Sequence, residues 1–215
     1  MNEPRCVPLG DSALTLVFGE VIDPVVHRRI LAVAGRLARR PPRAVREVVP
    51  AYTTIAIWFD PLEREAAGLA AELLDIALSV TSDAADAPGR EWIIPVRYDG
   101  PDLAEVATRL GLGIEDVVRR HQQRAYRVFL LGFVPGFAFL GELDPALVLP
   151  RRAAPRRKVP AGSVAIAGVQ TGVYPIDTPG GWHLIGRTDL ALFDPRRDPP
   201  TLLDVGDSVR FEAVP

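Results

Sequence analysis

Glycine and proline interrupt the second half of the chain so often that long helices are excluded there. From Phe129 to Pro215 the sequence consists of short apolar runs separated by these two residues. Glycine permits turn conformations that other residues avoid, and proline cannot donate a hydrogen bond within a central strand. Short strands divided by such turns are typical of a β-barrel or a β-sandwich. We therefore predict a mostly β structure for this part of the chain.

The first part of the chain shows a different pattern, in which strand and helix signals alternate. Residues 13–18 and 45–60 predict three strands, and each of these two segments is followed by a helical pattern. This order predicts a small α+β domain, which we place at residues 1–84. The small, polar and acidic segment 81–91 is the expected boundary, and the strand predicted at residues 92–99 is assigned to the second domain.

Each helix of the first part is predicted to begin at an aspartate–proline pair. Asp23 precedes Pro24, and Asp60 precedes Pro61. Aspartate at a helix start accepts hydrogen bonds from free backbone N–H groups, and proline suits the first helical position. The second helix is therefore expected to begin near Pro61, with Leu62 on its apolar face.

Two short helices are predicted between residues 101 and 126. The first should end at Gly111, and the second carries Glu115 and Asp116 in its first turn, where the helix dipole favours negative charge. His121 falls on the apolar side of the second helix. The spacing favours a packed, hydrogen-bonded histidine there, and a general base is the alternative.

Composition and charge exclude several classes of protein. With 48% hydrophobic and 24% charged residues the chain has the composition of a globular protein, and a net charge of −2 argues against a nucleic-acid binder. The most apolar run, Val128–Gly141, is too short and too interrupted to cross a membrane. The first ten residues lack the pattern of a signal peptide, so we expect a cytoplasmic protein.

The sequence also predicts neither a disulfide within the chain nor a metal site. Cys6 is the only cysteine, and His27, His121 and His183 lie far apart without a second ligand at metal-binding spacing. The phosphate-binding pattern G-x-x-x-x-G-K-[ST] and the nucleophile pattern G-x-S-x-G are both absent from the sequence.

The segment Val159–Gly186 contains almost no ionic side chain, but many groups that form hydrogen bonds. These groups are Ser163, Gln170, Thr171, Tyr174, Thr178 and the Trp182 indole. Residues 151–158 just before it pack five cations into eight positions, and Arg187 follows it. Such a lining would suit an amide, a lactam or a peptide, and an arginine rim would bind a carboxylate. The alternative is turn-rich β-structure beside a solvated loop.

Alternation within this segment makes a structural prediction. Val164 and Ile166 should face one side of a strand, and the intervening positions should face the other.

The segment Gly132–Asp144 also admits two interpretations. Its glycines and prolines would make turns while Phe133, Phe137 and Phe139 fill the core. Alternatively, glycine would let a ligand approach the backbone while the aromatic rings wall an apolar cleft.

These segments resemble one known family. LGFVPGFAFLGELD at 131–144 and PRRAAPRRKVPAGSVAIAGVQTGVYPIDTPGGWHLIGRT at 150–188 closely resemble the B subunit of 5-oxoprolinase, also called allophanate hydrolase subunit 1. That family includes an inhibitor of a sporulation histidine kinase. Arg151 and Arg156 occupy the arginine positions of the motif, and Asp189 stands where relatives often have proline. The resemblance extends from about residue 9 to residue 211.

The resemblance implies a fold, an activity and partners. The fold would be a small α+β N-terminal domain followed by a cyclophilin-like β-barrel at residues 90–215. The activity would be that of an enzyme complex that opens 5-oxo-L-proline to L-glutamate with ATP, in which the component that binds ATP is left open. This chain would act together with the C subunit, which is a related cyclophilin-like protein, and with the A subunit, which is thought to act on the lactam ring.

The residues and the resemblance together predict a substrate site at the barrel. A substrate carboxylate is expected at Arg156 or Arg187, and a proton transfer at His121 or His183. Amide-like atoms are expected to bind Gln170, Thr171 and Tyr174. The other residues expected to contact the substrate are Phe133, Pro135, Gly136, Phe137, Arg151, Gly162, Ser163, Gly172, Gly181 and Trp182.

Two other functions share the same motifs. The barrel of a regulatory protein could bind and inhibit a histidine kinase, or the chain could be subunit 1 of an allophanate hydrolase or urea carboxylase type of system. Neighbouring genes would separate these possibilities, since genes for the A and C subunits would favour the oxoprolinase.

Overall fold

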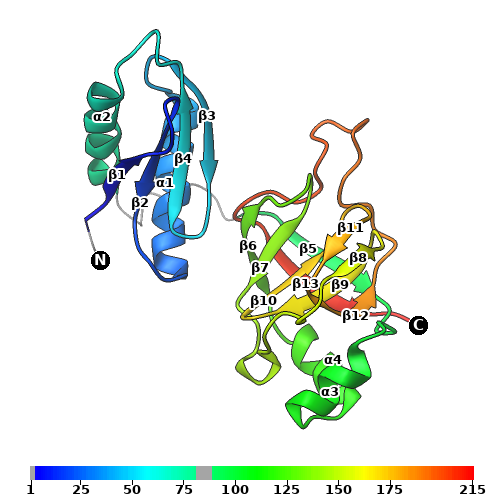
Figure 1. Cartoon of the computed structure of the whole chain (residues 1–215). Coiled ribbons are helices and arrows are strands. Elements are labelled where there is room, and N and C mark those ends of the chain that lie inside the picture. Colours follow the sequence, from blue (N-terminus) through cyan, green and yellow to red (C-terminus); the bar gives the residue numbers. More distant parts are fainter. Residues whose placement is uncertain (1–2, 81–88) are drawn as a thin grey trace. The chain divides into compact units, whose positions relative to one another are not determined.

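The computed structural model describes residues 3–80 and 89–215. The chain divides into two compact units, Met1–Pro88 and Gly89–Pro215, each with its own sheet and its own core (Figure 1). The segment predicted as a boundary, 81–91, lies almost wholly outside the described residues.

The first unit is a four-stranded antiparallel sheet with two helices on one face. Its strands, in sheet order, are β1 (Arg5–Pro8), β2 (Ala13–Val17), β4 (Thr54–Phe59) and β3 (Val45–Pro50). Its helices are α1 (Pro24–Arg39) and α2 (Ala66–Ser79). Leu14 and Leu16 of β2 and Ile55 and Ile57 of β4 form one core with buried residues of both helices. Since alternate residues of a strand face the same side, both helices cover the same face.

Helix α1 begins as predicted. The Asp23 carboxylate accepts hydrogen bonds from the backbone N–H groups of Val25 at 2.6 Å and Val26 at 3.3 Å, and Pro24 occupies the first turn. The aspartate and proline therefore perform the capping roles that their chemistry suggests.

The corresponding prediction for α2 is wrong, because this helix begins at Ala66. Asp60 instead organises the turn before the helix. It accepts a hydrogen bond from the backbone N–H of Leu62 at 3.0 Å and pairs with Arg46 at 3.0 Å. Leu62 is 97% exposed and packs in no core. An aspartate–proline pair serves a turn as well as a helix start, which explains the error.

The second unit is mostly β. Its strands are β5 (Glu91–Val96), β6 (Tyr126–Leu131), β7 (Ala138–Gly141), β8 (Arg156–Val159), β9 (Ser163–Ala167), β10 (Gln170–Val173), β11 (Thr178–Gly180), β12 (His183–Arg187) and β13 (Ser208–Ala213). Its helical segments are α3 (Leu103–Leu110), α4 (Ile114–Gln122) and the 3-10 helix η2 (Pro145–Leu147). Seven strands form one sheet in the order β12-β9-β10-β7-β6-β13-β5, and β8 pairs with β11 separately.

The seven-stranded sheet closes almost completely into a barrel. Its two edge strands meet just beyond β5, where the backbones of Arg97 and Arg187 exchange hydrogen bonds of 2.9 and 2.8 Å. Gly186 is required in this seam, because a Cβ there would lie 2.6 Å from the Arg97 carbonyl oxygen. Helices α3 and α4 lie together at one end of the barrel (Figure 1). The prediction of a mostly β, barrel-like structure is therefore confirmed.

Strand β9 has a different core on each side. Val164 and Ile166 belong to the main barrel core, whereas Ala165 and Ala167 pack into a second cluster that is rich in aromatic rings. The predicted alternation is confirmed. The small alanine side chains on the second side leave room for large rings, and these rings build the site described next.

Candidate functional site

A pocket of about 260 Å³ lies against the aromatic side of β9 in the second unit. Its lining residues are Phe133, Phe137, Phe139, Arg151, Pro155, Tyr174, Pro179, Gly180, Gly181 and Trp182. Ligand pockets for drug-sized molecules typically measure roughly 300–1,000 Å³, so this pocket suits a smaller molecule. The lining comes from the two segments that the sequence singled out, 132–144 and 151–186.

Phe137 is the centre of the aromatic lining. Its ring centroid lies 4.7 Å from that of Phe139, 5.2 Å from that of Tyr174 and 5.5 Å from that of Trp182, in each case edge to face. Aromatic pairs prefer this geometry, which contributes about 0.5–1.5 kcal/mol beyond the buried area. Phe137, Tyr174 and Trp182 are all buried, so these three rings form a rigid wall.

Tyr174 brings a hydroxyl group to this wall. A Cβ at Gly180 would lie 2.3 Å from the Tyr174 hydroxyl oxygen, so only glycine leaves room for the tyrosine. Burial raises the pKa of Tyr174, and a backbone hydrogen bond from Trp182 and the charges of nearby arginines offset this only in part. The hydroxyl therefore stays protonated at neutral pH and is able to donate a hydrogen bond.

Arg151 supplies positive charge to the pocket lining. Three other cations of residues 151–158 form ion pairs with aspartates that do not line the pocket. Lys158 pairs with Asp177 at 2.7 Å, while Arg152 and Arg156 both pair with Asp102. The arginine-rich segment is thus neither one solvated loop nor one positive rim.

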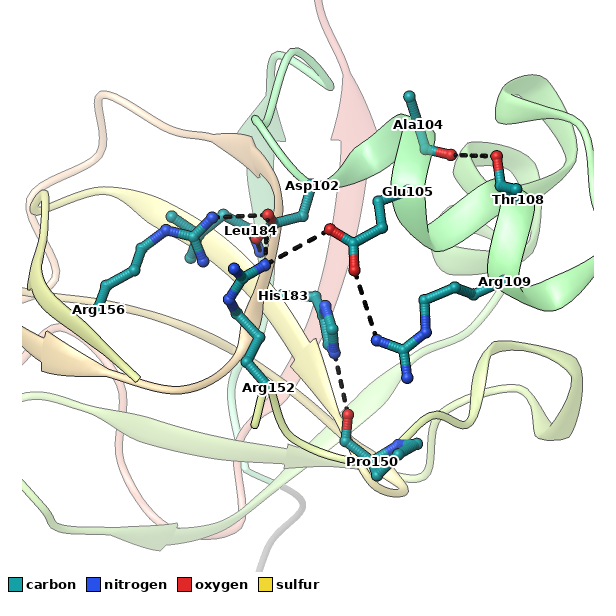
Figure 2. Close-up of polar contacts among 10 residues, drawn as sticks. All are labelled: Asp102, Ala104, Glu105, Thr108, Arg109, Pro150, Arg152, Arg156, His183 and Leu184. Carbon is teal, nitrogen blue, oxygen red and sulfur yellow. Dashed lines mark hydrogen bonds and ion pairs between the residues drawn. The ribbon is translucent and has the colours of Figure 1, made fainter. Parts of the chain in front are cut away.

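Asp102 is the residue that sequence reasoning missed. Its carboxylate accepts hydrogen bonds from Arg156 Nη2 at 2.6 Å, Arg152 Nη1 at 2.9 Å and the backbone N–H of Leu184 at 2.7 Å (Figure 2). Burial by itself raises the pKa of Asp102, but the hydrogen bonds from Arg156 and Leu184 and the two guanidinium charges together lower it below its usual value. The carboxylate is therefore ionised and neutralises two arginines.

This cluster fixes one wall of the pocket. Arg152 also donates its backbone N–H to the Gly181 carbonyl at 2.9 Å. Asp102 precedes α3, so the contacts connect a helix start, the arginine segment and β12. The lining residues Arg151 and Pro155 lie between or beside the two clamped arginines, and they are held in place with them.

His121 lies in the barrel core, where it is packed and hydrogen-bonded, and its proton-transfer role stays a prediction. The side chain is 0% exposed, and its ring stacks on Phe211 at a centroid distance of 4.5 Å. Its Nε2 lies 2.8 Å from Thr171 Oγ1 and its Nδ1 lies 2.7 Å from the Tyr98 hydroxyl. Burial lowers the pKa of His121 to about 3, so the ring is neutral.

The hydrogen bonds also determine which ring nitrogen carries the proton. Thr171 Oγ1 donates its single hydrogen to the Ala165 carbonyl at 3.1 Å, so it accepts from His121 Nε2. His121 Nδ1 therefore accepts from Tyr98. The Tyr98, His121 and Thr171 side chains thus use one another as hydrogen-bond partners. Thr171 is 0% exposed, and its amide-binding role stays a prediction.

His183 is also 0% exposed, and the pocket lining does not include it. Its Nε2 lies 2.9 Å from the Pro150 carbonyl oxygen, which is drawn in Figure 2. The ring is thus a structural contact to the start of the arginine segment. Neither imidazole is among the residues that line the pocket, and proton transfer at His121 or His183 stays a prediction.

The pocket lining does not include Arg187, Ser163 or Gly162, which were also expected at the substrate site. Arg187 pairs with Asp99 at 2.8 Å, and Ser163 donates its hydroxyl to the Pro160 carbonyl at 2.7 Å. Gly162 turns the chain, since a Cβ there would lie 2.2 Å from the Thr188 carbonyl oxygen.

Four further predicted positions are not part of the pocket lining. Gly172 packs behind the rings, where a Cβ would lie 3.2 Å from Phe137 Cζ. Gln170 is half-buried at the start of β10. Pro135 and Gly136 line a separate, shallower hollow.

Two features are absent from the described part of the chain. Residues 3–80 and 89–215 contain no cluster of three or more histidine, cysteine, aspartate or glutamate side chains arranged to hold a metal ion. Within the same ranges, none of the helices has the length and apolar character that crossing a membrane would require.

Comparison with known proteins identifies the relatives of this chain. A family model described as carboxyltransferase domain, subdomain C and D, matches residues 4–203. The 5-oxoprolinase B subunit of Bacillus subtilis (strain 168) is 42% identical over 96% of this chain and 91% of its own length. The 5-oxoprolinase B subunit of Escherichia coli O157:H7 is 44% identical, over 98% of this chain and 96% of its own length.

Solved structures show the same fold. TTHA0988 is 46% identical with a TM-score of 0.84 over 94% of this chain, which spans only 40% of the TTHA0988 chain. The protein PH0987 from Pyrococcus horikoshii is 40% identical with a TM-score of 0.57, and the match covers 97% of this chain and 97% of the PH0987 chain. The Kluyveromyces lactis urea carboxylase is 18% identical, with a TM-score of 0.79, and the match covers 99% of this chain and 22% of the carboxylase chain. At this identity the similarity shows the fold alone.

Proposed function

The chain belongs to the family of 5-oxoprolinase B subunits, within the carboxyltransferase domain, subdomain C and D, and from this we propose its activity. It is the B subunit of a complex that uses ATP to open 5-oxo-L-proline to L-glutamate in the cytoplasm. The A and C subunits are its partners. The barrel of residues 89–215 is the cyclophilin-like domain of this protein, and it binds the lactam.

The observation that carries the proposal is the composition of the pocket. 5-oxo-L-proline is a compact five-membered lactam with apolar methylene groups, one amide and one carboxylate. The rings of Phe137 and Trp182 suit its methylene face, and the Arg151 guanidinium suits its carboxylate. The protonated Tyr174 hydroxyl suits the amide oxygen. Each chemical part of the substrate thus has a partner in the lining.

The role that this lining supports is binding and orientation. Opening the lactam adds one water molecule, breaks the amide C–N bond and leaves a carboxylate and an amine. Rigid aromatic walls exclude bulk water from the ring, and Arg151 fixes the carboxylate, which is carried by the carbon next to the amide nitrogen of the bond that breaks. ATP supplies the driving force, and the partner proteins complete the site for the reaction itself.

The test is reconstitution of the complex. The chain is purified together with its candidate A and C subunits, and ATP-dependent formation of glutamate from 5-oxo-L-proline is measured. Arg151→Gln should raise the KM for 5-oxo-L-proline about 10- to 100-fold, since hydrogen bonds to a charged group contribute about 1.5–3 kcal/mol. Full activity without this chain would contradict the proposal.

A neighbouring arginine provides a matched control. Arg157 lies in the same segment as Arg151 and is likewise exposed, but it does not line the pocket. Arg157→Gln removes the same charge from the same segment and should leave KM unchanged. An equal effect of both substitutions would show that net charge, rather than the pocket, attracts the substrate.

A further inference from the structure

Phe133 combines two properties that are seldom found together. It is a bulky residue with a φ of 72°, in a region that residues other than glycine rarely adopt. Its side chain is also 63% exposed. Glycine would fit this backbone with less strain, and an exposed ring gains little from burial, so packing alone does not explain phenylalanine here.

The loop from Gly132 to Phe137 enforces this conformation. The Val134 N–H donates to the Gly132 carbonyl at 2.9 Å, which closes a three-residue γ-turn of the rarer, strained kind around Phe133. The Phe137 N–H donates to the Val134 carbonyl at 3.1 Å across Pro135 and Gly136. Gly136 has a φ of 79°, and this combination is typical of a type II turn.

The ends and the back of the loop are fixed as well. The Gly132 N–H donates to the Phe137 carbonyl at 3.1 Å, so the two turns are joined at their base. A Cβ at Gly136 would lie 2.7 Å from the Phe193 Cβ, which shows that the loop is packed closely from behind. These contacts hold the strained turn in one conformation.

The strained turn places the Phe133 ring at the pocket. The ring lines the pocket and meets the buried Phe137 ring edge to face, at a centroid distance of 5.6 Å and an interplanar angle of 82°. Phe137 belongs to the rigid inner wall, whereas Phe133 is largely open to solvent. Phe133 is therefore the outer aromatic wall of the pocket.

We propose that the Gly132–Phe137 loop keeps Phe133 strained so that its ring covers a compact cyclic amide bound in the pocket and selects it over open-chain amino acids. The identity of that amide as 5-oxo-L-proline rests on the proposed function. The opened product carries a second carboxylate, which loses hydration against an aromatic face and gains no attraction from it. The same wall therefore favours the lactam over the product and assists product release.

Removal of the Phe133 ring should have opposite effects on the stability of the protein and on its binding of substrate. Phe133→Gly relieves the backbone strain and should leave Tm unchanged or raise it, while KM for 5-oxo-L-proline in the reconstituted complex rises about 10-fold. Inhibition by L-glutamate should weaken less than substrate binding does. Phe133→Tyr keeps both the strain and the ring, and it should retain the wild-type KM.

Ala44 provides a matched control for strain alone. It is the other non-glycine residue with positive φ, 73°, among the described residues, and it belongs to the first unit. Ala44→Gly relieves strain of the same kind and should leave KM unchanged.

The outcomes separate this inference from the proposed function. An active complex in which Phe133→Gly retains the wild-type KM would overturn the inference alone. The inference would also be overturned if Phe133→Gly dissociated the complex while the remaining assembly kept its KM, because Phe133 would then anchor a partner. If the wild-type complex formed no glutamate, the proposed function would fail, and this inference would fail with it.

Discussion

The barrel unit buries two polar centres, around His121 and around Asp102, and it keeps them stable in opposite ways. His121 is completely buried among Tyr98, Tyr126 and Phe211, and it is neutral. Asp102 is only 2% exposed, yet it is ionised. The two centres differ in the partners that the fold provides.

At His121 the fold provides neutral hydrogen-bond partners. Burial then disfavours the charged ring and lowers its pKa to about 3. At Asp102 the fold provides two guanidinium groups and a backbone N–H, and these outweigh the cost of burial. A buried titratable group thus keeps its charge only where opposite charge accompanies it.

In both centres the side chains are engaged in contacts within the fold. Each donor and acceptor at His121 is already satisfied within the core, and the Asp102 carboxylate is occupied by two arginines. Residue types that suggest acid–base chemistry are used for structure here. The charged side chain in the pocket lining is that of Arg151.

The largest effect is expected from removing the charge at Asp102. Asp102→Asn keeps the size of the side chain but leaves Arg152 and Arg156 without their shared counter-charge. Breaking a buried ion pair on one side typically costs about 3–5 kcal/mol, and the partial exposure of both arginines favours the lower end. We expect the free energy of unfolding in denaturant to fall by about 3 kcal/mol.

The same variant should also disturb the pocket, because the cluster holds Arg151 and Pro155 in place. In amide hydrogen exchange, the N–H of Arg152, which is bonded to Gly181, should exchange faster in Asp102→Asn than in the wild type. A loss of less than 1 kcal/mol, with unchanged exchange, would mean that the arginines do not depend on Asp102.

An intermediate effect is expected from pH at the neutral centre. The unfolded chain binds a proton at His121 below about pH 6.5, whereas the folded chain does not until about pH 3. The contribution of the neutral His121 to the free energy of unfolding is therefore complete above about pH 6.5 and is lost as the pH falls from about 6.5 towards about 3. The loss should be about 1.4 kcal/mol per pH unit once the unfolded histidine is fully protonated.

The measurement compares wild type with His121→Gln between pH 7.5 and 5.5. The other two histidines are present in both proteins, so the difference between the two slopes reports His121. Asp102 does not contribute in this range, because its lowered pKa keeps it ionised in the folded chain. Equal slopes would show that His121 is protonated in the folded protein.

Sequence patterns predicted the features that depend on near neighbours. The alternation at Val164 and Ile166 and the cap at Asp23 were recognisable because two to four residues decide each of them. The aromatic pocket was predicted in part, with Phe137 and Trp182 correctly placed in its lining. The local sequence was misleading at Asp60, because an aspartate–proline pair suits a turn as well as a helix start.

Asp102 could not be found in this way. Its partners Arg152, Arg156 and Leu184 lie 50, 54 and 82 residues further along the chain, and only the closed barrel brings them together. The same holds for His121 and Thr171, which are 50 residues apart. The polar residues of the second half were therefore assigned to a ligand although the fold uses several of them internally.

The smallest effect is expected at an ion pair on the surface of the same barrel. Asp189 pairs with Arg97 at 2.8 Å across the closing seam. Asp189 is 80% exposed, so water replaces the lost contact when the carboxylate is removed. Asp189→Asn should shift Tm by less than about 2 °C, and 1 M salt should abolish even this shift.

Asp189→Asn can be compared directly with Asp102→Asn, because each substitution removes one negative charge that pairs with arginine. The two variants differ in burial and in the number of partners, since Asp102 binds two arginines and the Leu184 N–H whereas Asp189 pairs with Arg97. Thermal unfolding of both, at low and at high salt, should give a large and salt-insensitive loss for Asp102→Asn. If Asp189→Asn destabilised the barrel as much, closure of the seam would depend on its ion pair rather than on the backbone hydrogen bonds between Arg97 and Arg187.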